Sequence, residues 1–174
     1  IEHFKSRYGH LRVPIVSNNY PKTGKGHMTP DRVISFKEFL EILEYGPTDL
    51  RIFHWNILRV APALRNDFFV PGIMDGFVDE LPFIFFGGKG LKVALHYDID
   101  MSHVFLNQIH GRKRVILFKP NQSVNLYQHP FTGVSYVDLN NPNLYKYPAL
   151  ANAKGYEVML QPGETLFMPS GYWH

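Results

Sequence analysis

Short apolar segments separated by tight turns fill much of this chain, and this pattern constrains the fold more than any other feature. The segments typical of β-strands are 50–60, 83–86, 91–98, 104–109, 113–118, 157–160 and 165–169. One turn, Gln161-Pro162-Gly163-Glu164, has Pro followed by Gly, which favours a type II turn. Another, His110-Gly111-Arg112, predicts a hairpin-like connection between its flanking strands. Because no β-α-β alternation occurs, the sequence predicts a mainly β sandwich or barrel.

Two helices are expected to flank this β structure. The first covers about residues 35 to 45, where Ser35 caps the start, Glu38 completes a capping box and Ile34 packs against Phe39. The second runs from Pro62 to about Phe69. Apolar residues at helical spacing in the first helix predict that one of its faces packs on a sheet.

Composition excludes several classes of protein. A length of 174 residues, 45% hydrophobic and 19% charged, fits one globular domain covering residues 1–174. There is no cysteine, so disulfides and thiolate metal sites are excluded. The sequence contains no run of about 18 apolar residues, so it predicts no membrane span. We expect a cytoplasmic protein without a membrane partner. The net charge is +3, but the basic residues are scattered apart from Arg112-Lys113-Arg114, which is a weak basis for nucleic-acid binding.

Two histidines and an aspartate form a candidate metal site. His96 and Asp98 are two residues apart, so on a strand they point to the same side while Tyr97 points away. A second strand, ending at His174, can bring a third ligand beside them. Two imidazoles and one carboxylate hold non-haem Fe(II) and leave coordination positions open. His-x-Asp alone is weak evidence, since roughly 0.4 matches arise by chance in such a chain, and an isolated match is more often a satisfied polar pair.

Three longer stretches resemble a known family. Residues 86–98, 108–120 and 155–174, with the intervening 136–148, are similar to the cupin-like JmjC hydroxylases, and among these to the asparaginyl hydroxylase that inhibits hypoxia-inducible factor. The resemblance covers about residues 50 to 174. It implies a double-stranded β-helix of the jelly-roll or cupin type, the metal Fe(II), and the cosubstrates 2-oxoglutarate and O2. It also implies that Lys113 pairs with the distal carboxylate of 2-oxoglutarate.

The chain departs from that family at two cosubstrate contacts. Val93 stands where the asparaginyl hydroxylase has a threonine, and the usual asparagine falls on Val104. Ser102, His103 and Asn107 are the candidates to replace that asparagine. A further pocket residue, His54 or Asn56, is expected from the strand over 50–60, where a packing role is equally compatible.

Residues 119–156 are polar and rich in Asn, Pro and Tyr, with little periodicity. We expect this segment to be a long functional loop that covers the mouth of the barrel and helps to select the substrate. The resemblance implies a dioxygenase that hydroxylates a C–H bond, with a protein or peptide as substrate. A ribosomal-protein or tRNA-modifying JmjC oxygenase and a non-catalytic metal- or ligand-binding cupin remain alternatives. Because a ligand at the end of a chain would fray, we expect further segments on both sides, through which a homodimer could form.

Overall fold

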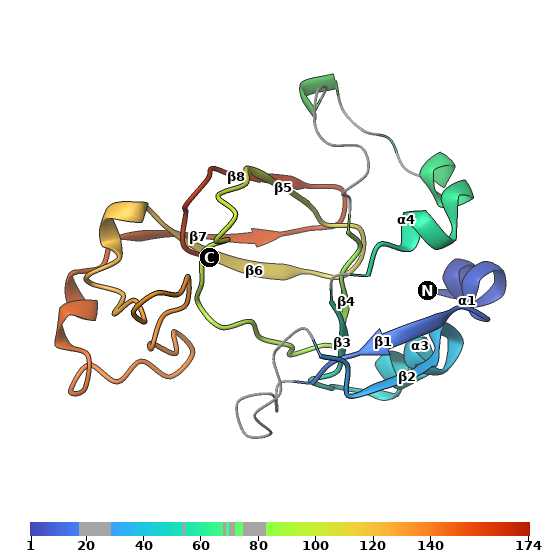
Figure 1. Cartoon of the computed structure of the whole chain (residues 1–174), viewed down its shortest axis with the longest axis horizontal. Coiled ribbons are helices and arrows are strands. Elements are labelled where there is room, and N and C mark those ends of the chain that lie inside the picture. Colours follow the sequence, from blue (N-terminus) through green and yellow to red (C-terminus); the bar gives the residue numbers. More distant parts are fainter. Residues whose placement is uncertain (18–28, 54, 68, 70–71, 75–82) are drawn as a thin grey trace. The chain divides into compact units, whose positions relative to one another are not determined.

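The computed structural model describes residues 1–17, 29–53, 55–67, 69, 72–74 and 83–174. The chain divides into two compact units, residues 1–92 and 93–174, and each is treated by itself. The helices and strands (Figure 1) are α1 (Glu2–Tyr8), β1 (Arg12–Ile15), β2 (Arg32–Ser35), α3 (Phe36–Tyr45), β3 (Arg51–Ile52), α4 (Ile57–Val60), β4 (Phe86–Gly87), β5 (Val104–Asn107), β6 (Lys113–Phe118), β7 (Gly155–Leu160) and β8 (Thr165–Met168). Short 3₁₀ helices cover Pro62–Asp67, Gly72–Met74, Pro120–Gln122 and Pro148–Asn152.

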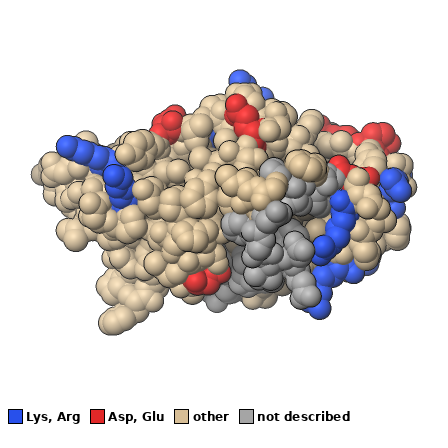
Figure 2. Space-filling view, turned by 90° about the horizontal axis from the view of Figure 1, so that it is seen from above, with Lys and Arg blue, Asp and Glu red and all other residues tan. Residues whose placement is uncertain are grey.

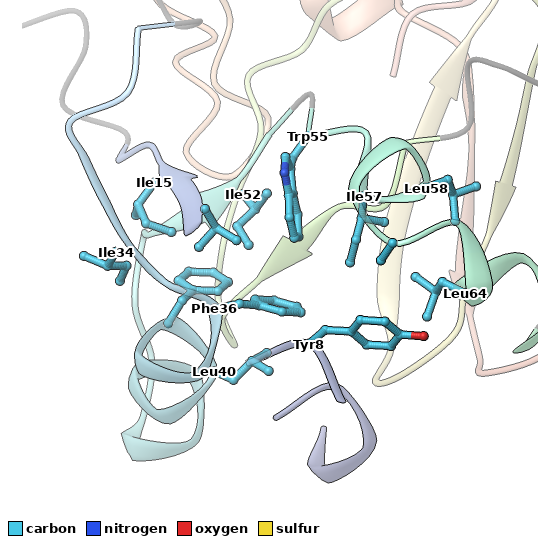
Figure 3. Close-up of a cluster of buried hydrophobic side chains, with 13 residues drawn as sticks. Tyr8, Ile15, Ile34, Phe36, Leu40, Ile52, Trp55, Ile57, Leu58 and Leu64 are labelled. Atoms are coloured by element: carbon cyan, nitrogen blue, oxygen red, sulfur yellow. The ribbon is translucent and has the colours of Figure 1, made fainter. Parts of the chain in front are cut away.

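The first unit is organised around α3. Ser35 caps this helix, and its hydroxyl accepts a hydrogen bond from the Glu38 backbone N–H at 3.2 Å, which confirms the predicted start. The apolar side of α3 packs into a core with the aromatic residues Phe36 and Trp55, whose rings lie 5.4 Å apart (Figure 3). β1 pairs with β2, and β3 pairs with β4, both antiparallel.

The prediction of a strand over residues 50–60 was wrong. β3 ends at Ile52, and α4 begins after Asn56, whose side-chain oxygen accepts a hydrogen bond from Arg59 N–H at 3.2 Å. Ile57 and Leu58 are both buried although they are neighbours, which a one-sided strand does not allow. Asn56 is therefore a helix cap, and His54 lies outside the described residues. The helix expected from Pro62 to Phe69 is a 3₁₀ helix that ends at Asp67.

In the second unit, two antiparallel strand pairs are nested. β5 pairs with β8, from Val104 opposite Met168 to Asn107 opposite Thr165. β6 pairs with β7, from Lys113 opposite Leu160 to Phe118 opposite Gly155. The two pairs are consecutive parts of one folded antiparallel ribbon, visible in Figure 1 as β5 beside β8 and β6 beside β7. The hairpin predicted around residues 110–112 does not form, because each flanking strand pairs with a partner far along the chain.

The ribbon folds where two connections lie side by side. Gln108 N–H donates to Glu164 O at 2.9 Å, and Gly163 N–H donates to Gln108 O at 2.8 Å. The type II turn is confirmed, since Glu164 N–H donates to Gln161 O and Gly163 has φ +89°. Residues 108–112 on one side face 161–164 on the other, so the first connection has one residue more.

Side chains on one face of both strand pairs share an apolar cluster. Its buried members are Val115, Leu117, Leu160 and Met168, with Val104, Leu106, Val158, Leu166 and Tyr172 packed against them. Lys113 belongs to the same face of β6 as Val115 and Leu117, because residues two apart on a strand point to the same side. Small antiparallel sheets are thus present, and the described strands do not close into a barrel.

The segment 119–156 was expected to be a loop, but residues 119–154 form a folded excursion built around an apolar cluster. This second cluster holds Leu126, Val137 and Leu150 of the excursion together with Leu95, Phe118 and Trp173 from neighbouring segments. In Figure 1 the excursion extends from the ends of β6 and β7. This cluster was not predicted from the sequence, because the apolar residues of the excursion are irregularly spaced in a polar segment. Among the described helices, none has the length and apolar character that crossing a membrane requires.

Candidate metal centre

Three short backbone segments lie side by side, and two of them carry the candidate ligands. The middle segment is 95–97, where His96 N–H donates to His174 O at 2.9 Å and His174 N–H donates to His96 O at 2.7 Å. On its other edge, Tyr97 N–H donates to Gly133 O and Ser135 N–H donates to Leu95 O, which places Val134 opposite His96. Directly paired residues of antiparallel strands point to the same face. The backbone therefore brings the two histidines onto one face as neighbours.

The candidate ligands form a tight group. One ligand atom from each of His96, Asp98 and His174 can be chosen so that all lie within 4.8 Å of one another, and all three residues are half-buried. His96 Nε2 is 3.9 Å from Asp98 Oδ1, and the two imidazole centroids are 4.4 Å apart. The structure thus brings together all three residues that the sequence selected. Asp98 lies beside His96, although the strand predicted over 91–98 does not form and is reduced to an isolated bridge at His96.

Hydrogen bonds orient both imidazoles in the same way. His96 Nδ1 lies 2.9 Å from Ala94 O, and His174 Nδ1 lies 3.1 Å from Tyr172 O. A carbonyl oxygen only accepts, so Nδ1 carries the proton in each ring. The Nε2 lone pairs are then left for a metal, and a backbone carbonyl on the other nitrogen is the usual support for a ligating histidine.

The surroundings also favour the neutral form of His96. Burial, followed by the neighbouring His174 imidazole, lowers the pKa of His96 below its ordinary value. A histidine must be unprotonated to bind a metal, so this shift prepares His96 for coordination. The donor set of two neutral imidazoles and one carboxylate suits a divalent transition metal such as Fe(II). The three residues therefore fit the ion that the sequence predicted.

A small open pocket adjoins the candidate ligands. Asp98 and His174 line it, together with Ser102, Val104, Met168 and Tyr172. Ser102 is thus placed beside the metal group, as the sequence suggested for a cosubstrate contact. Val104 contributes an apolar side chain to the same wall. The turn residues before His174 were not identified as part of this pocket from the sequence, because no spacing rule places Tyr172 in its wall.

Lys113 faces the same apolar cluster that supplies Val104 and Met168 to the pocket. Partial desolvation lowers the pKa of Lys113, even though the residue as a whole is exposed. In the part of the chain that the structure describes, no hydrogen bond or ion pair involves its ammonium group. A cation that loses water without gaining a counter-ion is suited to bind an anion.

The other two candidates for cosubstrate contacts are placed elsewhere. Asn107 lies on the opposite face of β5 from Val104 and Leu106, and its Oδ1 accepts a hydrogen bond from the Thr165 hydroxyl at 2.5 Å. His103 stacks on Phe167 at 5.7 Å, and its Nδ1 accepts a hydrogen bond from Ser170 N–H at 3.1 Å. Neither residue lines the pocket, so the structure does not group them with the candidate ligands.

Comparison with known proteins agrees with this architecture. The model of the cupin-like domain family matches residues 4–174, and the chain belongs to that family. Its jelly-roll β fold accounts for the nested strand pairs.

Several curated relatives are similar over much of this chain. JmjC domain-containing protein D of Dictyostelium discoideum is 38% identical over 136 residues, which cover 68% of this chain and 30% of the relative. tRNA wybutosine-synthesizing protein 5 of Danio rerio is 33% identical over 130 residues, covering 74% of this chain and 36% of the relative. Lysine-specific demethylase 8 of Danio rerio is 32% identical over 121 residues, covering 66% and 29%. The chain therefore spans about a third of the length of these relatives.

Proposed function

We propose that this chain carries the catalytic centre of an Fe(II)- and 2-oxoglutarate-dependent dioxygenase that hydroxylates a C–H bond. The observation that carries the proposal is the grouping of His96, Asp98 and His174 in a cupin-like chain whose relatives include JmjC proteins. Bound Fe(II) and 2-oxoglutarate would supply the oxidising chemistry, with O2 as co-reactant and succinate and CO2 as products. The nested strand pairs support a complete double-stranded β-helix as the scaffold of this centre.

The side chains of this chain would bind and orient the two cofactors. His96 and His174 offer Nε2 lone pairs, and Asp98 offers a carboxylate whose charge offsets part of the charge on the metal. Lys113 would bind the distal carboxylate of 2-oxoglutarate, as the resemblance implies, because its ammonium is partly desolvated and the residue belongs to the face of β6 that carries Val115 and Leu117. Ser102 at the pocket wall can add a hydrogen bond to the cosubstrate. The apolar side chain of Val104, which also lines the pocket, would limit the access of water to the bound cosubstrate.

The surface next to the metal group supports a protein or peptide side chain as substrate. Val134 stands directly opposite His96 and is 42% exposed, so an exposed apolar side chain adjoins the candidate metal. The segment that carries Val134, residues 120–145, contains neither Lys nor Arg. A nucleic acid needs cations along its phosphates, whereas an apolar side chain in a segment without cations suits an uncharged part of a peptide. On the face drawn in Figure 2, Lys and Arg side chains appear at several separate places. The resemblance to the asparaginyl hydroxylase supports the same substrate class.

A tRNA-modifying oxygenase is the second candidate, and the names of the relatives favour it. Proteins called tRNA wybutosine-synthesizing protein 5 from zebrafish, chicken and human all match this chain at 33–34% identity. The sequence pI of about 9.1 is compatible with an acidic partner. RNA and peptide can be separated by which of them stimulates the conversion of 2-oxoglutarate to succinate.

An anaerobic titration tests the metal and cosubstrate assignments. Fe(II) is added to the protein, followed by 2-oxoglutarate, and the visible charge-transfer absorption of the ternary complex is recorded. We expect the wild type and the exposed-histidine variant His110→Ala to give the band. The His96→Ala/Asp98→Ala double variant should give none while keeping its far-UV circular dichroism. Tight stoichiometric iron in the double variant would overturn the ligand assignment.

A turnover assay in air then tests the substrate class. Succinate is measured with peptide fractions and with RNA fractions, and the substrate is checked for a mass gain of one oxygen. Stimulation by peptide supports the first candidate, and stimulation by RNA supports the second. Metal binding without succinate from any fraction would favour a cupin that binds metal or a small ligand without catalysis.

A further inference from the structure

We propose that Ser123 and Gln128 are positioning residues for the candidate metal ligands. They act from the side of the ligand segments that faces away from the metal group, through the side chains of Trp173 and Tyr97. The inference rests on the proposed metal centre, and it assigns a role to the folded excursion that follows β6. Neither residue touches the metal group. Each acts through a neighbour of a ligand in the sequence.

Tyr97 and Trp173 occupy the back of the two ligand segments. Tyr97 lies between His96 and Asp98, and Trp173 immediately precedes His174, so on extended backbone both point away from the metal face. Their rings meet edge to face, with centroids 4.9 Å apart and planes at 85°. Trp173 is completely buried in the cluster that also contains Leu126, Val137 and Leu150 of the excursion. The back of the centre is therefore a packed aromatic pair.

Two hydrogen bonds tie this aromatic pair to the excursion. Trp173 Nε1–H donates to the Ser123 hydroxyl oxygen at 3.0 Å. The Ser123 hydroxyl in turn donates to Pro120 O at 2.7 Å, so its proton points away from the indole. Gln128 Nε2 donates to the Tyr97 hydroxyl oxygen at 3.0 Å and to Thr132 O at 2.9 Å. The indole Nε1 of Trp173 and the hydroxyl of Tyr97 are thus each held by a side chain that has a second hydrogen bond to the backbone of the excursion.

The ligand segments need such support because their own pairing is short. His96 and His174 exchange two backbone hydrogen bonds, and the neighbouring pair, Phe118 with Trp173, exchanges two more. Neither His96 nor His174 lies within one of the longer strands β5 to β8. Consecutive residues share a planar peptide bond, so a backbone shift that follows from moving the indole or the phenol also moves the neighbouring imidazole. Groups that hydrogen-bond a metal ligand directly typically change metal affinity by 10- to 100-fold when removed, and residues one contact further out should act at the low end of that range.

The test uses Co(II) as a probe whose visible spectrum reports the geometry of its ligands. Ser123→Ala removes the acceptor and leaves a buried indole N–H unpaired, and Gln128→Leu removes both donors at similar volume. We expect each variant to bind Co(II) about 10-fold more weakly, with an altered visible spectrum. Ser123→Thr, which keeps a hydroxyl, should restore both readouts.

Tyr127→Phe is the matched control. The Tyr127 hydroxyl is part-buried in the same excursion, accepts a hydrogen bond from Ala149 N–H at 2.9 Å, and bonds neither Trp173 nor Tyr97. This variant should lose thermal stability comparably yet keep the wild-type Co(II) spectrum and affinity. Wild-type binding and spectrum in both Ser123→Ala and Gln128→Leu would overturn the inference. An equal loss of affinity in Tyr127→Phe would also overturn it, by showing general destabilisation. Absence of Co(II) binding by the wild type would overturn the metal centre itself and the positioning role with it.

Discussion

At the scale of single residues, Lys113 shows a conflict between stability and the proposed function. Desolvation lowers its pKa, which means that the folded state disfavours the charged form. At neutral pH this penalty is fully present, and it is relieved only as pH rises through the lowered pKa towards the unfolded value. An anionic ligand would remove the penalty by pairing with the ammonium.

Lys113→Met should therefore affect stability and binding in opposite directions. We expect the ligand-free variant to unfold at a slightly higher temperature than the wild type, because an apolar side chain replaces a partly desolvated charge. Its affinity for 2-oxoglutarate should fall by more than about tenfold, the scale of a broken buried charge pair. Thermal unfolding and a cosubstrate titration measure the two effects, with the exposed Lys119→Met as the control. If the affinity of Lys113→Met for 2-oxoglutarate were unchanged, a residue other than Lys113 would have to bind the distal carboxylate.

The sequence was sufficient to select the candidate ligands but not all of their surroundings. His96 and Asp98 follow from the two-residue period of a strand, and the family motif adds His174. The pattern could not decide between Ser102, His103 and Asn107, because the strand register between Asp98 and Gln108 was ambiguous. The pairing of Val104 with Met168 gives the strand register, and with this register Asn107 lies on the face of β5 opposite Val104 and Leu106.

At the scale of elements, two predictions that rest on a few adjacent residues were confirmed. The Ser35 cap and the type II turn around Gly163 depend on a few adjacent residues, and both are present. The hairpin around Gly111 was wrong because strand partners are chosen by long-range burial, which short turns do not reveal. The excursion core was missed for the same reason: Leu126, Val137 and Leu150 come together only in three dimensions.

The cap at Ser35 provides a test of the first unit. Ser35→Ala should lower the free energy of unfolding by about 1 kcal/mol, because the first turn of α3 loses the acceptor for Glu38 N–H. Ser35→Asp, which keeps an acceptor and adds a favourable charge at the helix start, should retain the wild-type value. Urea unfolding followed by circular dichroism measures both. Equal stability of the Ala variant would mean that the cap contributes nothing in this context.

At the scale of the whole molecule, metal binding should raise stability in a pH-dependent way. A metal at 100 times its dissociation constant stabilises the folded state by about 2.7 kcal/mol. Both histidines must be neutral to bind it, and the lowered pKa of His96 keeps that residue neutral at neutral pH. The stabilisation by Co(II) should therefore be full at neutral pH and decline as the pH falls through the lowered pKa of His96, where protons compete with the metal for the imidazole.

Thermal unfolding with and without Co(II), across this pH range, measures the effect. The His96→Ala/Asp98→Ala variant is the control and should show no shift at any pH. A Co(II) shift that persisted unchanged well into the acid range would point to carboxylate ligands instead of imidazoles.

The direct opposition of His96 and His174 in the backbone has one more consequence. A metal held by both would cross-link two parts of the chain that are distant in sequence, closing a loop that contains the ribbon and the excursion. Such a link acts as a removable counterpart of a disulfide in a chain that has no cysteine. After a single proteolytic cut in the excursion, the two fragments would be joined by the metal as well as by the β5–β8 and β6–β7 pairs, so a chelator should lower the denaturant concentration at which they separate.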